Sequence, residues 1–147
     1  MKISTRIRYG TRAMLELAAH YGEGAIELKE IAQKESISPK YLEQLITPLR
    51  TAGLVKSSRG SKGGYSLGRP PSEIYLKDVY EVLEGPVCFV DCLRDPKVCP
   101  RVSSCVTRDI WQEVSEAVGK IFRSITLQDL LQRKKQKEGI APSMYEI

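Results

Sequence analysis

The chain has 147 residues, 41% of them hydrophobic and 28% charged, which suits one globular domain with a short appended element. No apolar stretch approaches the roughly 20 residues that span a membrane, and the charged amino terminus lacks the apolar core of a secretory signal, so we expect a cytoplasmic protein with no membrane partner. The entire net charge of +5 lies in residues 1–75, which favours a polyanionic partner or, equally, a solvated basic surface.

The first half of the sequence predicts three helices. Met14, Leu17 and Ala18 recur at helical spacing, and a short second helix follows around residues 28–32. Ser38-Pro39 opens the third helix, because Ser is a favoured N-cap and Pro loses no needed N–H at the first helical position. The tight connection between the second and third helices is typical of a helix-turn-helix.

The third helix has one apolar and one polar face. Its apolar residues follow the spacing of a buried stripe: Leu42, Leu45, Ile46 and Leu49. The opposite face carries side chains that can reach base edges or phosphates: Lys40, Tyr41, Glu43, Gln44, Thr47 and Arg50. Pro48 lies within this helix, where it costs about 3 kcal/mol, so we expect a kink or a tightened turn there.

A hairpin is predicted after the third helix. Two short strands, residues 54–58 and 65–67, flank a glycine-rich turn that carries Arg59 and Lys62. Such a narrow basic tip suits the minor groove of DNA. A nucleotide-binding loop is the alternative, but the G-x-x-x-x-G-K-[ST] pattern is absent and a strand follows where that motif requires a helix.

The second half is predicted to be helical around a cysteine-rich loop. A helix over residues 76–83 ends at Gly85-Pro86, and a long amphipathic helix starts near Thr107. Its apolar residues alternate by four and three, as in a coiled-coil seam: Ile110, Val114, Ala117, Ile121 and Ile125. The seam packs either on its own domain or on a second copy, and we expect a homodimer, because two-fold symmetry lets a helix-turn-helix protein bind a palindrome. Thr126 with Asp129 resembles the start of a separate final helix.

These elements predict a mainly α fold with a small β-hairpin wing, a winged helix-turn-helix followed by a long C-terminal dimerisation helix. The predicted parts are a DNA-binding domain (1–84), a cysteine-bearing loop (85–106), dimerisation helices (107–131) and a polar, flexible tail (132–147). An enzyme is not expected, because one histidine and no C-x-x-C pair cannot supply a nucleophile, a base and an orienting group.

All cysteines of the chain fall within eighteen residues, spaced C-x₃-C-x₆-C-x₅-C: Cys88, Cys92, Cys99 and Cys105. Four thiolates on one loop can bind an iron–sulfur cluster or a metal ion. Zinc ranks lower because no C-x-x-C pair is present, and disulfides rank lower still in a reducing compartment. Buried structural thiols are the remaining alternative.

Three segments resemble the Rrf-type winged-helix transcription regulators, and among them most closely the IscR-type iron–sulfur regulators: residues 41–44, 49–55 and 58–65. The resemblance implies a homodimer that binds duplex DNA at a palindromic operator and controls iron–sulfur cluster assembly or related stress genes. It also implies an iron–sulfur cluster, [2Fe–2S] rather than [4Fe–4S], that modulates DNA affinity.

The resemblance assigns residues to both sites. Those implied to line the major groove are Ser38, Lys40, Tyr41, Glu43 and Gln44, and those implied to reach the minor groove or its phosphates are Arg59, Ser61 and Lys62. The implied cluster ligands are Cys92, Cys99 and Cys105. Arg108 stands where IscR-type proteins have a histidine, and Arg8 stands where nitric-oxide sensors have an acid, so the fourth ligand is open between Cys88, an acid of the partner chain and no ligand.

The carboxyl terminus supports a second hypothesis. Tyr145 and Ile147 resemble the terminal Tyr-x-Ile with which CymR-type regulators of cysteine metabolism bind cysteine synthase. The alternative is a disordered tail without a partner.

Overall fold

The computed structural model describes residues 2–145, with the side chains of residues 2–139. Within that part of the chain the elements, in order, are α1 (Thr5–Ala19), α2 (Leu28–Glu35), α3 (Pro39–Thr51), β1 (Val55–Ser58), β2 (Gly64–Leu67), η1 (Pro71–Glu73), α4 (Leu76–Glu84), α5 (Asp91–Arg94), η2 (Pro96–Val98), α6 (Val106–Ser124) and α7 (Leu127–Tyr145). The fold is mainly helical with one antiparallel hairpin, as predicted. None of the helices described is long and apolar enough to cross a membrane.

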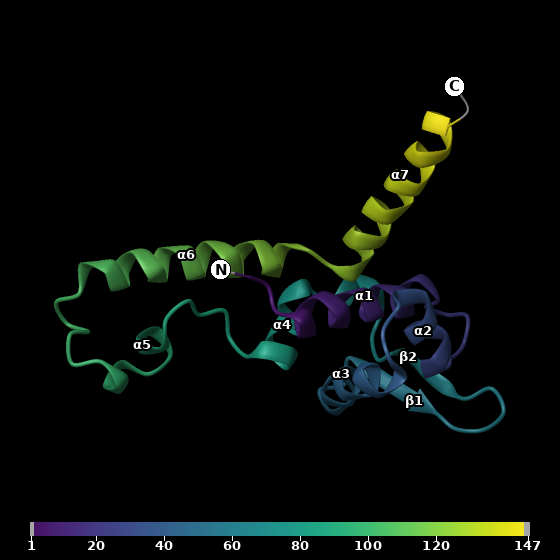
Figure 1. Cartoon of the computed structure of the whole chain (residues 1–147), viewed down its shortest axis with the longest axis horizontal. Coiled ribbons are helices and arrows are strands. Elements are labelled where there is room, and N and C mark those ends of the chain that lie inside the picture. The colour runs from purple at the N-terminus through teal and green to yellow at the C-terminus, as the bar shows by residue number, and fades with distance from the viewer. Residues whose placement is uncertain (1, 146–147) are drawn as a thin grey trace.

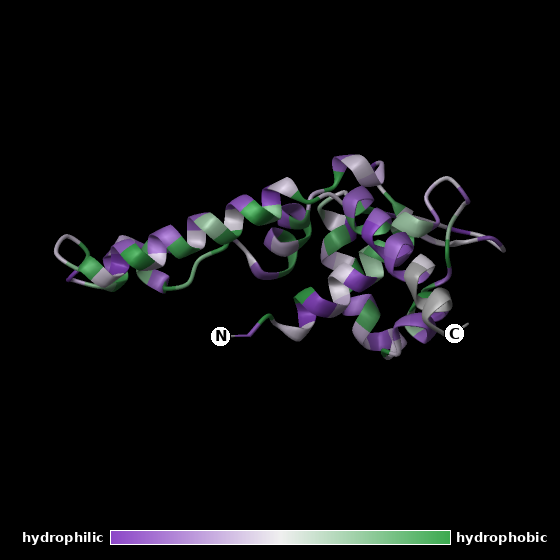
Figure 2. Ribbon diagram, turned by 90° about the horizontal axis from the view of Figure 1, so that it is seen from above, coloured by the Kyte–Doolittle hydropathy of each residue, from purple (hydrophilic) through white to green (hydrophobic). Residues whose placement is uncertain are grey.

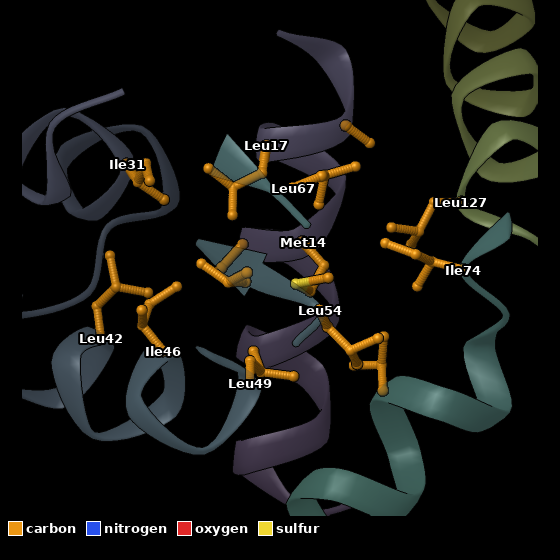
Figure 3. Close-up of a cluster of buried hydrophobic side chains, with 14 of the residues drawn as sticks. Met14, Leu17, Ile31, Leu42, Ile46, Leu49, Leu54, Leu67, Ile74 and Leu127 are labelled. Carbon is orange, nitrogen blue, oxygen red and sulfur yellow. The ribbon is translucent and has the colours of Figure 1, made fainter. Parts of the chain in front are cut away.

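The hydrophobic core lies between α1, α2, α3, the hairpin and the start of α7 (Figure 3). Met14 and Leu17 of α1 are fully buried at its centre, against the buried stripe predicted for α3. Each such side chain contributes about 1.5–3 kcal/mol through removal of its apolar surface from water. We call this part, residues 5–84 with the first turn of α7, the body.

The turn between α2 and α3 has the tight form of a helix-turn-helix. Ser36 ends α2 in the left-handed region at φ 56°, and the Ile37 N–H donates to the Ala32 carbonyl at 3.0 Å. Ser38 caps α3 by accepting a hydrogen bond from the Tyr41 N–H at 3.1 Å. Both caps fix the entry of α3, which confirms the predicted helix start.

Helix α3 continues through Pro48 to Thr51, so the predicted kink or tightened turn does not end it. The hydroxyl of Thr47 donates to the Glu43 carbonyl at 2.8 Å, and that of Thr51 donates to the Thr47 carbonyl at 3.1 Å. These bonds add side-chain donors around the proline, which has no N–H of its own.

The hairpin pairs β1 with β2 in the register Val55↔Leu67 to Ser58↔Gly64. Ile26 adds one further bridge, because its N–H donates to the Tyr65 carbonyl at 2.8 Å and its carbonyl accepts from the Tyr65 N–H at 2.7 Å. Gly64 has φ 149°, and a Cβ there would overlap the Ile26 carbonyl. Glycine at this position therefore allows the wing to sit against the segment before α2.

The long helix α6 extends away from the body, and the segment with α5 runs beside it (Figure 1). The ring of Phe122 packs on Tyr80 of α4, with centroids 5.1 Å apart. At the base, the Leu76 N–H donates to the Ile125 carbonyl at 2.8 Å. Ile125 is the C-cap of α6 and is partly buried, so it does not continue the predicted seam.

Helix α7 begins at the capping box predicted from Thr126 and Asp129. The Thr126 N–H donates to the Asp129 carboxylate at 2.9 Å, and the Asp129 N–H donates to the Thr126 hydroxyl at 3.1 Å. Hydrogen bonds from the Thr126 N–H and hydroxyl hold the pKa of Asp129 below its usual value. The motif therefore starts a new helix, separated from the end of α6 by the two residues 125 and 126.

The first turn of α7 belongs to the body. Leu127 is fully buried, Leu130 and Leu131 pack against the same core, and the Leu127 N–H donates to the Ile74 carbonyl at 2.9 Å. Residues 127–131, which the sequence grouped with the dimerisation helices, thus also pack on the core. The helix then continues to Tyr145, through the segment predicted as a flexible tail.

Candidate nucleic-acid interface and cysteine segment

The polar face of α3 is exposed, opposite the buried stripe. Six of the side chains predicted for it are exposed, and Tyr41 is half-buried; the exposed ones are Ser38, Lys40, Glu43, Gln44, Thr47 and Arg50. Helix α3 packs against β1, and Figure 1 shows α3 and the hairpin on the same edge of the body. The structure therefore brings the predicted helix face and the predicted wing onto one surface.

Tyr41 is positioned by residues of α1 that the sequence did not single out. The Tyr9 ring meets the Tyr41 ring edge-on, with centroids 6.1 Å apart and planes at 89°. The Arg12 guanidinium lies 5.4 Å from the Tyr9 centroid and forms an ion pair with Glu35 of α2. These contacts restrict how Tyr41 moves on the polar face. Only the fold reveals them, because α1 and α3 are distant in sequence.

An ion pair between a buried carboxylate and a partly exposed lysine links α1 to α2. The Glu16 carboxylate is only 6% exposed, lies 2.9 Å from Lys34 Nζ and 3.6 Å from His20 Nδ1. The hydrogen bond to Glu16 raises the pKa of Lys34. His20, the single histidine, is thus half-buried beside the Glu16 carboxylate, at the end of α1. Helix α1 packs against both helices of the helix-turn-helix.

The wing tip, residues 59–63, presents uncompensated positive charge. Arg59, Ser61 and Lys62 are all exposed, and Gly60 at φ 103° makes the turn. Among the residues described, no carboxylate lies within 4.0 Å of Arg59 or Lys62. Such cations are free to bind phosphates, since no internal ion pair must break first.

The four cysteines are free and half-buried in the segment 85–105. Cys92 lies on α5, Cys99 follows η2, and Cys105 is the N-cap of α6. Hydrogen bonds from the Thr107 hydroxyl and from the Arg108 N–H lower the pKa of Cys105, which favours a thiolate ligand. Cys88 is engaged elsewhere, because its thiol donates to the Val90 carbonyl at 3.0 Å.

The thiols suit an iron–sulfur cluster in number and chemistry, but they are not assembled. Nowhere between residues 2 and 145 do three Cys, His, Asp or Glu side chains lie close enough to hold a metal ion together. A segment that binds a cluster must therefore close around it. Ile147 and the side chain of Tyr145, which the sequence predicts to bind a partner, lie outside the described residues.

The predicted seam of α6 is an exposed apolar face, and Figure 2 shows hydrophobic residues recurring along the helix. Ile110 is 50% exposed and Ile121 is 56% exposed, with Ala117 exposed and Val114 half-buried between them. Val106, at the start of the helix, is 76% exposed. A row of exposed apolar side chains is typical of an interaction surface.

Comparisons with known proteins agree with this geometry. The profile of the Rrf2 family, described as an iron-dependent transcriptional regulator, matches residues 3–133. The HTH-type transcriptional regulator CymR of Bacillus subtilis is 48% identical over 130 residues, which cover 88% of this chain and 89% of that protein.

Solved structures are similar over nearly the whole length. The structure of CymR, titled the global cysteine regulator of B. subtilis, has a TM-score of 0.76 and 46% identity, covering 90% of this chain and 98% of that one. The structure of T. potens IscR has a TM-score of 0.78 and 42% identity, covering 93% of this chain and 90% of that one. The chain is thus about equally similar to a CymR and to an IscR.

Proposed function

Because the chain belongs to the Rrf2 family of transcriptional regulators, we propose that it is a cytoplasmic homodimer that binds a palindromic DNA operator. It is a regulator and not an enzyme. The observation that supports the proposal is the shared surface of α3 and the wing, with its unpaired cations. The apolar face of α6 supplies the contact between the two copies.

Each part of the surface has a separate task in this proposal. Helix α3 enters the major groove, where Gln44 can bind adenine, and Glu43 can accept from cytosine and repel other bases. The wing tip reaches the minor groove or its phosphates through Arg59 and Lys62. Tyr9 packs against Tyr41 and holds it in place, so Tyr9 affects the contact of Tyr41 with DNA without touching the DNA itself.

The salt dependence of DNA binding tests the proposal. Four cations per protomer lie on the proposed surface: Lys40, Arg50, Arg59 and Lys62. If all reach phosphates, a dimer neutralises about eight of them, and log K falls against log salt with a slope of about −7. Fluorescence anisotropy with a duplex selected from a random library measures the slope. A slope near zero, or failure to enrich any duplex, contradicts the proposal.

We also propose that Cys92, Cys99 and Cys105 bind an iron–sulfur cluster, [2Fe–2S] rather than [4Fe–4S]. The family description, the similarity to T. potens IscR and the lowered pKa of Cys105 support this assignment. A bound cluster would link these three cysteines, because each thiolate would bond to an iron atom of the cluster. Closing residues 92–105 around it shifts the start of α6, because Cys105 caps that helix. In this way cluster occupancy changes DNA affinity and controls genes for cluster assembly or related stress.

Anaerobic reconstitution tests the ligand set. Cys99→Ala is expected to remove most of the visible absorption of the cluster and most of the bound iron, because the cluster loses one of its three proposed thiolate ligands. Cys88→Ala is the matched variant, and it decides whether that residue is the fourth ligand. Full cluster content in Cys99→Ala would contradict the proposed ligand set. If the unaltered protein binds zinc but no iron, the cysteines form a zinc site and not a cluster site.

A CymR-type role is the second candidate, supported by the 48% identity to CymR of B. subtilis. Here Tyr145 and Ile147 bind cysteine synthase, and the protein regulates cysteine or sulfur metabolism. A peptide of the last ten residues is then expected to inhibit cysteine synthase, whereas a peptide without the terminal isoleucine does not. If neither peptide nor protein inhibits, this candidate is removed.

A further inference from the structure

A cavity of about 480 Å³ lies between α4, the segment after it and the inner side of α6. Three arginines from two elements line it: Arg94 of α5, and Arg108 and Arg123 of α6. The size is that of sites for small organic molecules, which span about 300–1,000 Å³. Apolar walls are supplied by Val87 and Leu93.

The lining of this cavity carries a net positive charge, because four cations, the three arginines and Lys77, outnumber its two carboxylates. The two carboxylates on its wall have other partners: Glu81 pairs with Lys77 at 3.7 Å, and Glu116 accepts from the Gln112 amide at 3.1 Å. In the part of the chain that the structure describes, no carboxylate lies within 4.0 Å of the three arginines.

Arg108 provides a second, independent sign of a missing ligand. Its Nε atom is buried and has no hydrogen-bond partner among the described residues. A buried donor without a partner is costly, and in native structures it usually marks an unseen ligand or water. Arg94 donates only one long bond, 3.4 Å, to the Pro86 carbonyl. Guanidinium groups in this state favour carboxylates and phosphates, which they bind through paired hydrogen bonds.

The apolar face of α6, which we propose as the dimer contact, does not line the cavity. The α6 residues of the cavity follow one helix face, at positions 108, 112, 115, 119 and 123. The apolar face runs through positions 110, 114, 117 and 121, an offset of two residues, which is about 200° around a helix. The cavity and the proposed dimer contact therefore lie on opposite sides of α6.

We propose that this cavity binds a small organic anion, whose carboxylate or phosphate groups are held by Arg94, Arg108 and Arg123. The bound anion touches α4 of the body and α6 at once, and it presses the segment that carries Cys88 onto α6. It thereby fixes the angle between each DNA-binding domain and the dimer helix. This regulatory consequence rests on the proposed function, whereas the binding itself does not.

Calorimetry with the full chain, free of DNA, tests the site. The probes are citrate for carboxylates, glycerol 3-phosphate for a phosphate, and glycerol as the neutral control. Binding of either anion but not of glycerol is expected, and preference between them identifies the ligand class. Arg123→Gln is expected to weaken binding about tenfold or more, because a charge-assisted pair is lost. Arg94→Gln provides a second variant should the first not fold.

The matched control is Arg101→Gln, which removes the same charge from an exposed residue outside the cavity wall. Its affinity for the anion should stay within about twofold, since only screened long-range attraction changes. Equal losses in Arg101→Gln and Arg123→Gln, or no binding of either anion at millimolar concentration, overturn the site. If the operator affinity is the same with and without the bound anion, the anion has no regulatory role, but the binding site stands. If the protein does not bind DNA at all, the proposed function is refuted, and the binding site again stands.

Discussion

Replacing Ile121 with Glu is expected to convert the protein from a dimer to a monomer and to remove most of its operator affinity. Ile121 is 56% exposed on the apolar face of α6, and in a two-fold interface each copy contributes it once. A dimer would therefore bury two unpaired carboxylates. At 2–5 kcal/mol for each unpaired buried charge, dimer affinity falls by about a thousandfold or more.

The loss of DNA binding follows from the loss of the second half-site. A dimer places two copies of α3 about one helical turn of DNA apart, whereas a monomer gains the contacts of one half-site only. Sedimentation equilibrium gives the dimer affinity, and anisotropy gives the operator affinity. Tyr21→Glu is the control for the dimer affinity alone, because Tyr21 is also exposed, at 47%, but lies beside the hairpin and not on α6. A dimeric Ile121→Glu protein places the interface elsewhere.

Local signals in the sequence were sufficient for the elements of the body. Ser38-Pro39 predicted the start of α3, the glycines around Arg59 predicted the hairpin, and Thr126 with Asp129 predicted the start of α7. Each of these motifs satisfies its own backbone groups within a few residues, so its structure depends little on the rest of the chain. Prediction succeeded where the cause is local.

The pattern of apolar residues did not reveal what each of them packs against. Leu127 belongs to the core, whereas Ile110 and Ile121 are exposed, yet all three are apolar residues of predicted helical segments. Periodicity reports which face is apolar, not its partner. Ile125 was placed in the seam for the same reason, although it ends α6 and accepts a hydrogen bond from Leu76.

The residues of the candidate sites were likewise predictable only where the signal lies within one short segment of the sequence. Arg59 and Lys62 were found because charge and glycine occur together in one turn, and the cysteines because of their spacing. Tyr9 lay hidden, since its contact with Tyr41 joins two helices. The arginines of the cavity were also missed, because they come from separate elements that only the fold brings together.

Arg59→Ala is expected to weaken operator binding about a hundredfold or more. Arg59 is exposed at the wing tip and has no ion pair among the described residues, so its removal leaves the fold intact. A charge-assisted hydrogen bond contributes about 1.5–3 kcal/mol, and a dimer loses this contact twice. The slope of log K against log salt should also become shallower by about two, since two phosphate contacts disappear.

Two further variants separate the contact from a general charge effect. Arg59→Lys keeps the charge but not the planar fork, so it should restore the salt slope and only part of the affinity if Arg59 reads a groove. Arg69→Ala removes an arginine that pairs with Asp78 at 3.8 Å, and a change of less than about threefold is expected there, because an exposed ion pair contributes little. Unaltered affinity in Arg59→Ala would mean that the wing stays clear of the DNA, and then α3 alone must supply both affinity and specificity.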